Sequence, residues 1–338
     1  MLLYKQEIND RQIGSWNYAF GVIAARETKL LKQDAIDRLF AARTLAEYDS
    51  LRVSMGYSGD DYRQAIELSK KEDYRLLSEI MPQGVYLELL LLANEYHNLK
   101  AMLKAQLLAE KSLEQSDLER ISMGPYLTDP QKMLEFLQEK SNDLKVDLRT
   151  LVARVKENWL ATYDVANLDN EITQAYWQEL ITKLAELDDE FLRNYFALQR
   201  DLINIEAVLR ANQLNMKTEQ LAKVLLPEGQ IKHERLLNWL TEGVEVMATY
   251  LRHNGFKELA EVASEYGKPG TASLYASASD KLLLNFLREQ STTKAGPVRV
   301  LLYFLRREQE RKNIELAHIA VANQLSEERI REIKREVV

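Results

Sequence analysis

Hydrophobic residues recur at helical spacing through the middle of the chain. In one stretch they follow each other at intervals of three and four residues: Tyr195, Leu198, Leu202, Ile205 and Leu209. This spacing places them on one face of an α-helix. The segment between Pro130 and Pro227 contains neither proline nor glycine, and a β-rich domain would normally need such turn residues. The pattern predicts an all-α fold built from long helices, with a break near residues 166–170.

Local signals mark where several helices begin. An aspartate precedes Pro130, which pairs an N-cap residue with proline at the first helical position. A second helix opens at Pro297 and is predicted to run to about Asn323. Ser326 caps a short last helix whose first turn is acidic. Residues 266–270, Tyr-Gly-Lys-Pro-Gly, are typical of a loop.

One short pattern occurs three times in the chain. It consists of an acidic residue, two further residues, an asparagine, then leucine or isoleucine, with an alanine seven residues after the asparagine. The copies run from Glu95 to Ala105, from Asp201 to Ala211 and from Glu310 to Ala320. Their asparagines, at 98, 204 and 313, are 106 and 109 residues apart, which is the length of a small helical domain. We therefore predict three similar domains, residues 1–115, 116–225 and 226–338.

Helix geometry gives this pattern a meaning. The acid, the asparagine and the positions four and seven residues later share one helix face. The position four residues after the asparagine is Met102, Val208 or Ala317, so the acid and the amide lie beside apolar or small side chains. Polar groups on a buried face need partners. Two interpretations stay open: a polar clasp between helices of one domain, and contact with an inserted partner protein.

The second interpretation defines a set of candidate partner-binding residues. They are Glu95, Asn98, Lys104, Asp201, Asn204, Arg210, Glu310 and Asn313. Lys104 and Arg210 follow their asparagines by six residues, about 120° from the acid–asparagine midline on the helix wheel, so they need not share the buried face. The third copy departs from the other two, because Arg311 and His318 occupy its stripe, and we expect its surroundings to differ.

Composition narrows the possible functions. The 338 residues include 46% hydrophobic and 29% charged residues, with a net charge of −7, which disfavours wrapping nucleic acid. There is no cysteine, so disulfides and thiolate metal sites are excluded, as expected of a cytoplasmic protein. Met1 to Glu7 carry charges too early for a secretory signal. No run approaches the roughly 18 apolar residues of a membrane span, so membrane association would go through a partner.

No combination of residues forms a convincing active site. The histidines, His97, His233, His253 and His318, are scattered, and no local spacing brings together the ligands that a metal requires. The Gly-Lys-Pro-Gly-Thr stretch at 267–271 lacks the residue order of a phosphate-binding loop and any preceding strand. We therefore expect no enzymatic activity of the chain itself, no catalytic residue, no metal and no cofactor.

Several blocks of sequence resemble one known family. They are residues 18–31 (YAFGVIAARETKLL), 96–105 (YHNLKAMLKA), 201–211 (DLINIEAVLRA), 301–314 (LLYFLRREQERKNI) and 326–331 (SEERIR). In their order and spacing they are similar to the C subunit of the archaeal and bacterial V/A-type rotary ATPases. The same family includes the d subunit of the eukaryotic V-ATPase.

The resemblance implies a fold and a role. The fold would be three similar helical domains arranged as a pseudo-threefold funnel. The funnel would sit on the cytoplasmic face of the membrane rotor ring and receive the central shaft, so that torque passes between the ATP-hydrolysing head and the ion-carrying ring. The partners would be the shaft subunits and the ring subunits, with no nucleic acid, and the chain would carry no catalytic residues.

Two other classes of protein stay open. A helical-repeat scaffold would explain the repeat and the missing chemistry, but its usual period is about 33–47 residues, much shorter than the spacing here. An all-helical enzyme could assemble a site from distant residues, although nothing in the sequence favours it. Co-purification distinguishes these classes, because a protein that couples shaft and ring should bring down rotor and ring subunits.

Overall fold

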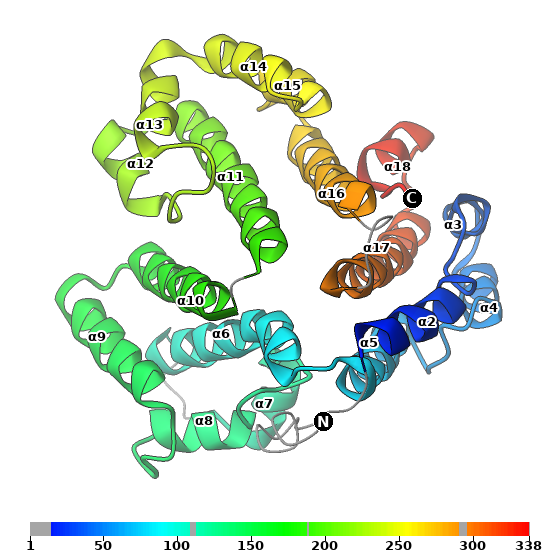
Figure 1. The fold of residues 1–338 in the computed structure, drawn as a ribbon, viewed down its shortest axis with the longest axis horizontal. Helices are drawn as coiled ribbons and strands as arrows, with labels where there is room; N and C mark the ends of the chain where they lie inside the picture. Colours follow the sequence, from blue (N-terminus) through cyan, green and yellow to red (C-terminus); the bar gives the residue numbers. More distant parts are fainter. Residues whose placement is uncertain (1–14, 109–112, 188, 291–295, 338) are drawn as a thin grey trace. The chain divides into compact units, whose positions relative to one another are not determined.

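The fold is all-α, as the hydrophobic pattern predicts. The computed structural model (Figure 1) describes residues 15–108, 113–187, 189–290 and 296–337, and in these ranges it contains helices and connecting turns but no strand. Within the same ranges, none of the helices is both long and apolar enough to cross a membrane. The segment Met1 to Glu7, which bears on the secretory-signal prediction, lies outside the described residues.

Contacts divide the chain into two compact units, each discontinuous in sequence. The first contains residues 74–189 together with Ser15, and the second contains residues 16–73 and 190–338. The boundary between them falls within helix α5 (Tyr62–Ile80). The predicted division of the chain at residues 115 and 225 stays a prediction. The contacts show that segments from opposite ends of the chain share the second unit.

The first unit is built around two long helices that pack together. Its elements after α5 are α6 (Gly84–Leu108), α7 (Gln115–Ile121), α8 (Pro130–Leu137), α9 (Val146–Thr162) and α10 (Val165–Leu187). Helix α6 packs against α10, α9 packs against α10, and the short helices α7 and α8 contact α6. Leu99 and Leu103 of α6 and Leu180 of α10 are fully buried, so the core lies between these helices.

The second unit contains helices from both ends of the chain. Its elements besides α5 are α2 (Trp16–Glu27), α3 (Gln33–Phe40), α4 (Leu45–Ser54), α11 (Glu190–Gln213), α12 (Thr218–Val224), α13 (His233–Glu242), α14 (Val244–His253), α15 (Lys257–Ser264), α16 (Thr271–Gln290), α17 (Pro297–Ala322) and α18 (Glu327–Ile333). Helix α11 packs against α13 and α16, and α17 packs against α2, α3, α4 and α16. Figure 1 shows α17 beside the N-terminal helices.

One hydrophobic cluster joins the N-terminal helices to α17. Ile36, Leu39 and Tyr48 pack with Ile314 and residues one and two turns further along α17. The hydroxyl of Tyr48 donates a hydrogen bond of 2.7 Å to the carbonyl of Ile314. A contact across 266 residues of sequence therefore fixes α4 on the C-terminal helix.

Most predicted helix boundaries are confirmed. Pro130 is the first residue of α8, and the carboxylate of Asp129 accepts a hydrogen bond of 2.9 Å from the Gln131 backbone N–H. Helix α17 begins at Pro297 and ends one residue before Asn323. Ser326 caps α18, accepting from the Arg329 N–H at 3.4 Å, and residues 266–270 connect α15 to α16.

The predicted break near residues 166–170 is wrong, since α10 runs through them. The break lies at Tyr163 and Asp164. Tyr163 adopts a left-handed conformation with φ of 52°, which ends α9. The carboxylate of Asp164 accepts hydrogen bonds from the N–H groups of Ala166 and Asn167 at 2.8 and 3.3 Å, so it caps α10.

Candidate functional site

The three acid–asparagine pairs lie on the long helices α6, α11 and α17 and are almost completely buried. The exposed fraction is 1% for Glu95 and Asn98, 2% for Asp201, and 0% for the other three, Asn204, Glu310 and Asn313. Such groups lose their water on folding and must find hydrogen-bond partners inside the protein. The predicted burial of this helix face is therefore confirmed.

Each asparagine holds the backbone of one distant residue by two hydrogen bonds. The amide Nδ2 donates to the backbone carbonyl, and the amide Oδ1 accepts from the backbone N–H of the same residue. The partners are Met123 for Asn98 (3.1 and 2.6 Å), Leu226 for Asn204 (3.2 and 2.7 Å) and Arg335 for Asn313 (2.9 and 2.9 Å). Every partner stands two residues beyond a short helix, α7, α12 or α18. We call these three contacts the asparagine clasps.

The acid, one turn before the asparagine, holds the segment that leads into the next helix. In the first copy, Glu95 accepts from the Thr128 hydroxyl and pairs with the Lys145 amine at 2.8 Å. In the second copy, Asp201 accepts from the backbone N–H groups of Gln230 and Ile231 at 2.8 and 3.1 Å. The acid and the asparagine thus fix both ends of one connecting loop to the long helix.

The third copy is completed from the other end of the chain. Glu310 accepts a hydrogen bond of 2.6 Å from the backbone N–H of Leu31, which lies just before α3. Its other oxygen accepts from the Tyr57 hydroxyl at 2.9 Å. In the other two copies the acid is held by a segment that follows it in sequence, whereas here the N-terminal segment supplies that contact. The N-terminal segment thus takes the place, in the third copy, that the following segment takes in the other two.

The second clasp requires a glycine in its loop. A Cβ on Gly229 would clash with the carbonyl of Ala197 and with the carboxylate of Asp201. Backbone and carboxylate approach each other too closely here for any side chain. The absence of a side chain at Gly229 thus allows this loop to lie directly against α11.

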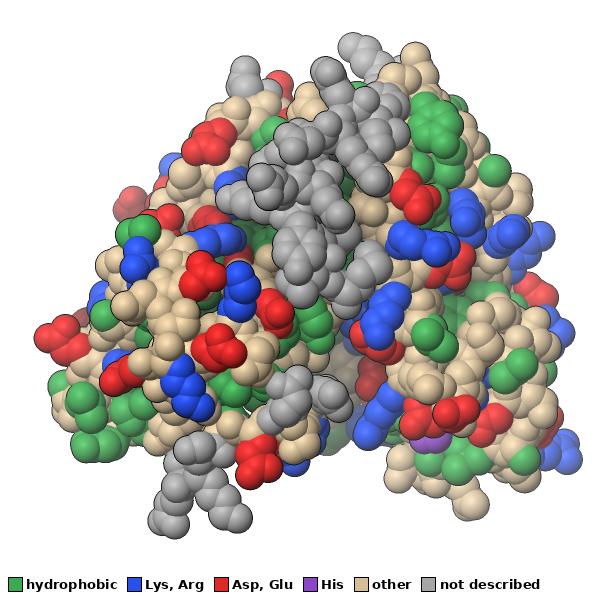
Figure 2. All heavy atoms as spheres, turned by 90° about the horizontal axis from the view of Figure 1, so that it is seen from below, with side chains coloured by type: hydrophobic (Ala, Val, Ile, Leu, Met, Phe, Trp, Pro, Cys, Tyr) green, Lys and Arg blue, Asp and Glu red, His purple; other side chains and the backbone are tan. Residues whose placement is uncertain are grey.

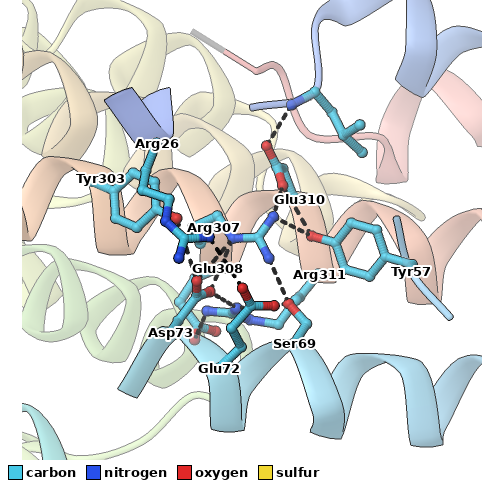
Figure 3. Close-up of polar contacts among 11 residues, drawn as sticks. Arg26, Tyr57, Ser69, Glu72, Asp73, Tyr303, Arg307, Glu308, Glu310 and Arg311 are labelled. Carbon is cyan, nitrogen blue, oxygen red and sulfur yellow. Dashed lines mark hydrogen bonds and ion pairs between the residues drawn. The ribbon is translucent and has the colours of Figure 1, made fainter. Parts of the chain in front are cut away.

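A buried polar cluster distinguishes the third copy (Figure 3). Arg307 Nε pairs with Asp73 at 2.9 Å, and its Nη2 donates to the Ser69 hydroxyl at 2.8 Å. Arg311, only 2% exposed, pairs with the same Asp73 carboxylate and donates to Ser69 at 3.2 Å. The Tyr303 hydroxyl donates to Asp73 at 3.4 Å. These contacts tie α17 to α5.

The expected departure of the third copy is confirmed. Arg311 occupies the position of Tyr96 in the first copy and Leu202 in the second. His318 stacks on Tyr62, with ring centroids 4.1 Å apart. Sequence reasoning missed Arg307 and Asp73, because their partnership joins residues 234 apart. The sequence did contain one signal: a second arginine lies close to Arg311 on the same helix. Two arginines on a buried helix face need an acidic partner from another part of the chain.

Burial and charge act against each other in this cluster. Burial raises the pKa of Glu310 above its ordinary value, although Arg307 and the Leu31 N–H oppose the shift. Burial alone would lower the pKa of the Arg307 guanidinium, but the neighbouring Tyr57 and Asp73 raise it above its ordinary value. The Arg307 guanidinium and the carboxylates that it contacts therefore stabilise one another, because each is a buried charge that needs a partner.

Lys104 and Arg210 lie outside the buried clasps. Lys104 pairs with Asp169 of α10 at 2.8 Å, and one third of its side chain is exposed. Arg210 pairs with Glu206 on its own helix at 2.6 Å, and 62% of its side chain is exposed. They do not share the face of the asparagines. The partner-binding role of all eight candidate residues stays a prediction.

The arrangement is built for holding loops in place. Over the described ranges, no three histidine, aspartate or glutamate side chains converge as metal ligands. The Gly267–Gly270 loop has left-handed glycines with φ of 111° and 88° and connects two helices. The buried acids Asp201 and Glu310 accept hydrogen bonds from backbone N–H groups, so their oxygens are engaged in fixing the chain.

The sequence of this chain matches a known protein family along nearly its whole length. The profile of the ATP synthase (C/AC39) subunit family matches residues 19–333, nearly the whole chain. The chain belongs to this family, which confirms the resemblance found in the sequence.

Individual relatives also match along nearly the whole chain. The C subunit of the A-type ATP synthase of Desulfurococcus sp. (strain SY) is 22% identical over 337 residues, covering 95% of this chain and 91% of its own length. The proteins of the same name from Thermococcus kodakarensis and Pyrococcus furiosus are 21% and 23% identical, again over 95% of this chain and 91% and 90% of their own.

Proposed function

We propose that this chain is a non-catalytic central-stalk subunit of a V/A-type rotary ATPase. It links the rotor shaft of the ATP-hydrolysing head to the membrane rotor ring and transmits torque for ion transport. The observation that carries the proposal is the family match over residues 19–333, together with relatives named as the C subunit of the A-type ATP synthase. The match favours this function over a repeat scaffold of unrelated role.

The asparagine clasps support a mechanical function. A protein that transmits torque must not lose force in flexible connections between its helices. Each clasp anchors a loop to a long helix by two hydrogen bonds, and in the second copy the neighbouring acid anchors the same loop again. Buried and fully paired polar contacts of this kind make a structure rigid. In this proposal the three helical domains form a pseudo-threefold funnel around the shaft.

The surface supports protein partners over nucleic acid. Figure 2 shows lysine and arginine side chains interspersed with acidic ones on one face, with hydrophobic side chains between them. Large hydrophobic residues with more than half of their surface exposed include Leu160, Tyr163 and Leu214. In the proposed assembly the chain is peripheral on the cytoplasmic face of the membrane, and the ring holds it there.

Affinity purification tests this assignment. A tagged chain, isolated from cells that make it under its own promoter, should co-purify with the shaft subunits, the head and the membrane ring after mild detergent extraction. The isolated chain should neither hydrolyse nor tightly bind ATP. A tagged cytoplasmic protein of similar charge serves as the control. Recovery of the chain alone, or with proteins unrelated to an ATPase, would contradict the proposal.

A further inference from the structure

Arg306 of α17 is a half-buried cation that pairs with none of the residues that the structure describes. Its Nε is fully buried and makes no hydrogen bond. No described residue accepts a hydrogen bond from its guanidinium or forms an ion pair with it. Arginine stays charged in proteins, and a buried charge that is left unpaired is strongly unfavourable. Such a group is expected to meet a counter-charge when the protein is assembled.

The charges around Arg306 do not supply that counter-charge. Glu27 of α2 already pairs with Arg299 through both Nε at 3.2 Å and Nη2 at 2.5 Å. Glu310 is occupied by the clasp contacts described above. Arg288 of α16 adds a further positive charge nearby. Both carboxylates near Arg306 are therefore already engaged with other groups.

The same surroundings act on the protonation of Arg306. Burial lowers the pKa of the Arg306 guanidinium, and the neighbouring Arg288 and Arg299 lower it further against the opposing Glu27. The charged form is therefore less stable here than in water, although arginine still holds its proton at neutral pH. A nearby anion would remove this disadvantage.

The other two copies show that helix packing does not need an arginine at this position. Arg306 precedes Asn313 by seven residues, and the matching residues are Leu91 and Ala197. Both are buried, with 0% and 9% of their surface exposed. An aliphatic side chain thus fills the site in two copies, whereas the third has an arginine that pairs with no described residue. A charged group in a half-buried position of this kind calls for a compensating contact.

We propose that Arg306 is an anchor for a carboxylate of a partner protein. The planar guanidinium matches an aspartate or glutamate side chain by two parallel hydrogen bonds. A protruding acidic side chain can reach a recessed guanidinium, whereas an anionic lipid surface would meet a chain of net charge −7. The proposal rests on the proposed function, because the partner is another component of the same ATPase.

Substitution of Arg306 by leucine tests whether this arginine binds a partner or is only poorly packed. Arg306→Leu gives α17 the side chain that the first copy has, so the isolated chain should unfold at a temperature equal to or above that of the wild type. Its association with the remaining ATPase should weaken by about 30-fold or more at 0.1 M salt, as is typical when one member of a desolvated ion pair is removed. Arg75→Leu is the matched control, because that arginine is 65% exposed. Unchanged association of Arg306→Leu would overturn the proposal.

A chemical cross-link identifies the counter-charge. Arg306→Lys keeps the positive charge and supplies an amine that a carbodiimide joins to a carboxylate in direct contact. In the assembled ATPase, mass spectrometry should find position 306 linked to an aspartate or glutamate of another protein of the complex. A link only to Glu27 or Glu310 would show that the counter-charge is internal and would refute the anchor. A second result would also refute the anchor: inorganic phosphate or anionic vesicles protect the wild-type chain against thermal unfolding, and Arg306→Leu abolishes this protection. The anion that binds Arg306 would then not be a protein carboxylate.

The outcomes distinguish this proposal from the proposed function. If the wild-type chain assembles with the ATPase and Arg306→Leu assembles equally well, only the anchor fails. If the wild-type chain does not assemble with the ATPase at all, the proposed function itself fails, and with it the anchor that rests on it.

Discussion

Asn313 holds the backbone of Arg335 at both polar groups, with Nδ2 donating to the carbonyl at 2.9 Å and Oδ1 accepting from the N–H at 2.9 Å. The side chain of Arg335 continues the connection, because its Nη1 donates to the carbonyl of Ser273 on α16 at 2.9 Å. Two residues later, the N–H of Val337 donates to the Gln33 side chain of α3 at 3.2 Å. Residues 335–337 thus join α17, α16 and α3.

Removal of this C-terminal segment should loosen the N-terminal helices. Deleting residues 335–338 leaves the Asn313 amide buried without its partner, at a cost of about 2–4 kcal/mol in unfolding free energy. Hydrogen exchange measured by mass spectrometry should speed up in residues 33–40, although they lie at the opposite end of the sequence. Deleting Val338 alone is the control. Unchanged exchange in α3 after the longer deletion would show that the tail does not hold it.

The second clasp can be tested with a single side chain. Asn204→Ala leaves both the N–H and the carbonyl of Leu226 without their Asn204 partner, and it should lower the free energy of unfolding by about 2–3 kcal/mol. Exchange of the Leu226 amide should accelerate more than that of the α11 amides. Asn254→Ala, at the exposed end of α14, should change stability by less than about 0.5 kcal/mol. Equal effects of both substitutions would mean that the clasp contributes nothing specific.

In the polar cluster of the third copy, loss of the shared acid should cost more stability than loss of one of its two arginines. Asp73→Asn removes the carboxylate shared by Arg307 and Arg311, so two buried cations lose a common partner, and we expect a loss of about 3 kcal/mol or more. Arg311→Leu leaves Asp73 paired with Arg307 and should cost less. Urea unfolding of each variant and of the double variant measures the difference. A larger loss for Arg311→Leu than for Asp73→Asn would contradict this assignment of partners.

Lys104 and Arg210 offer a test of the predicted partner surface. The double variant Lys104→Glu with Arg210→Glu should weaken pull-down of the shaft subunits several-fold at low salt and less at high salt, because exposed charge pairs are screened. Circular dichroism checks that the helices persist. Binding that is unchanged at both salt concentrations would remove these two residues from the interface.

The fold class and the helix boundaries at prolines could be predicted, because they depend on local spacing and capping. The burial of Asn98, Asn204 and Asn313 followed from helix periodicity for the same reason. Which residues they hold could not be predicted, since the partners are backbone groups that carry no sequence signal. The contact of Leu31 with Glu310 in the third copy joins two residues that are 279 positions apart in the sequence.

The same limit applies to Arg306. Its type and position can be seen in the sequence, but its lack of a partner among the described residues depends on where Glu27 and Glu310 lie after folding. The misplaced break near residues 166–170 has a local cause instead. A left-handed residue at the end of a helix is usually glycine, and here it is Tyr163, so the sequence does not mark the end of α9. Only the capping carboxylate of Asp164 marks the start of α10.

In the function that we propose, this chain couples the head of a rotary ATPase to its membrane ring. The most direct measurement compares ATP hydrolysis with ATP-driven ion transport in the same membrane vesicles, with the chain present, removed, and added back as purified protein. We predict that removal leaves hydrolysis by the head but abolishes ion transport, and that the added chain restores transport. Ion transport at the wild-type rate in vesicles that lack the chain would contradict the account.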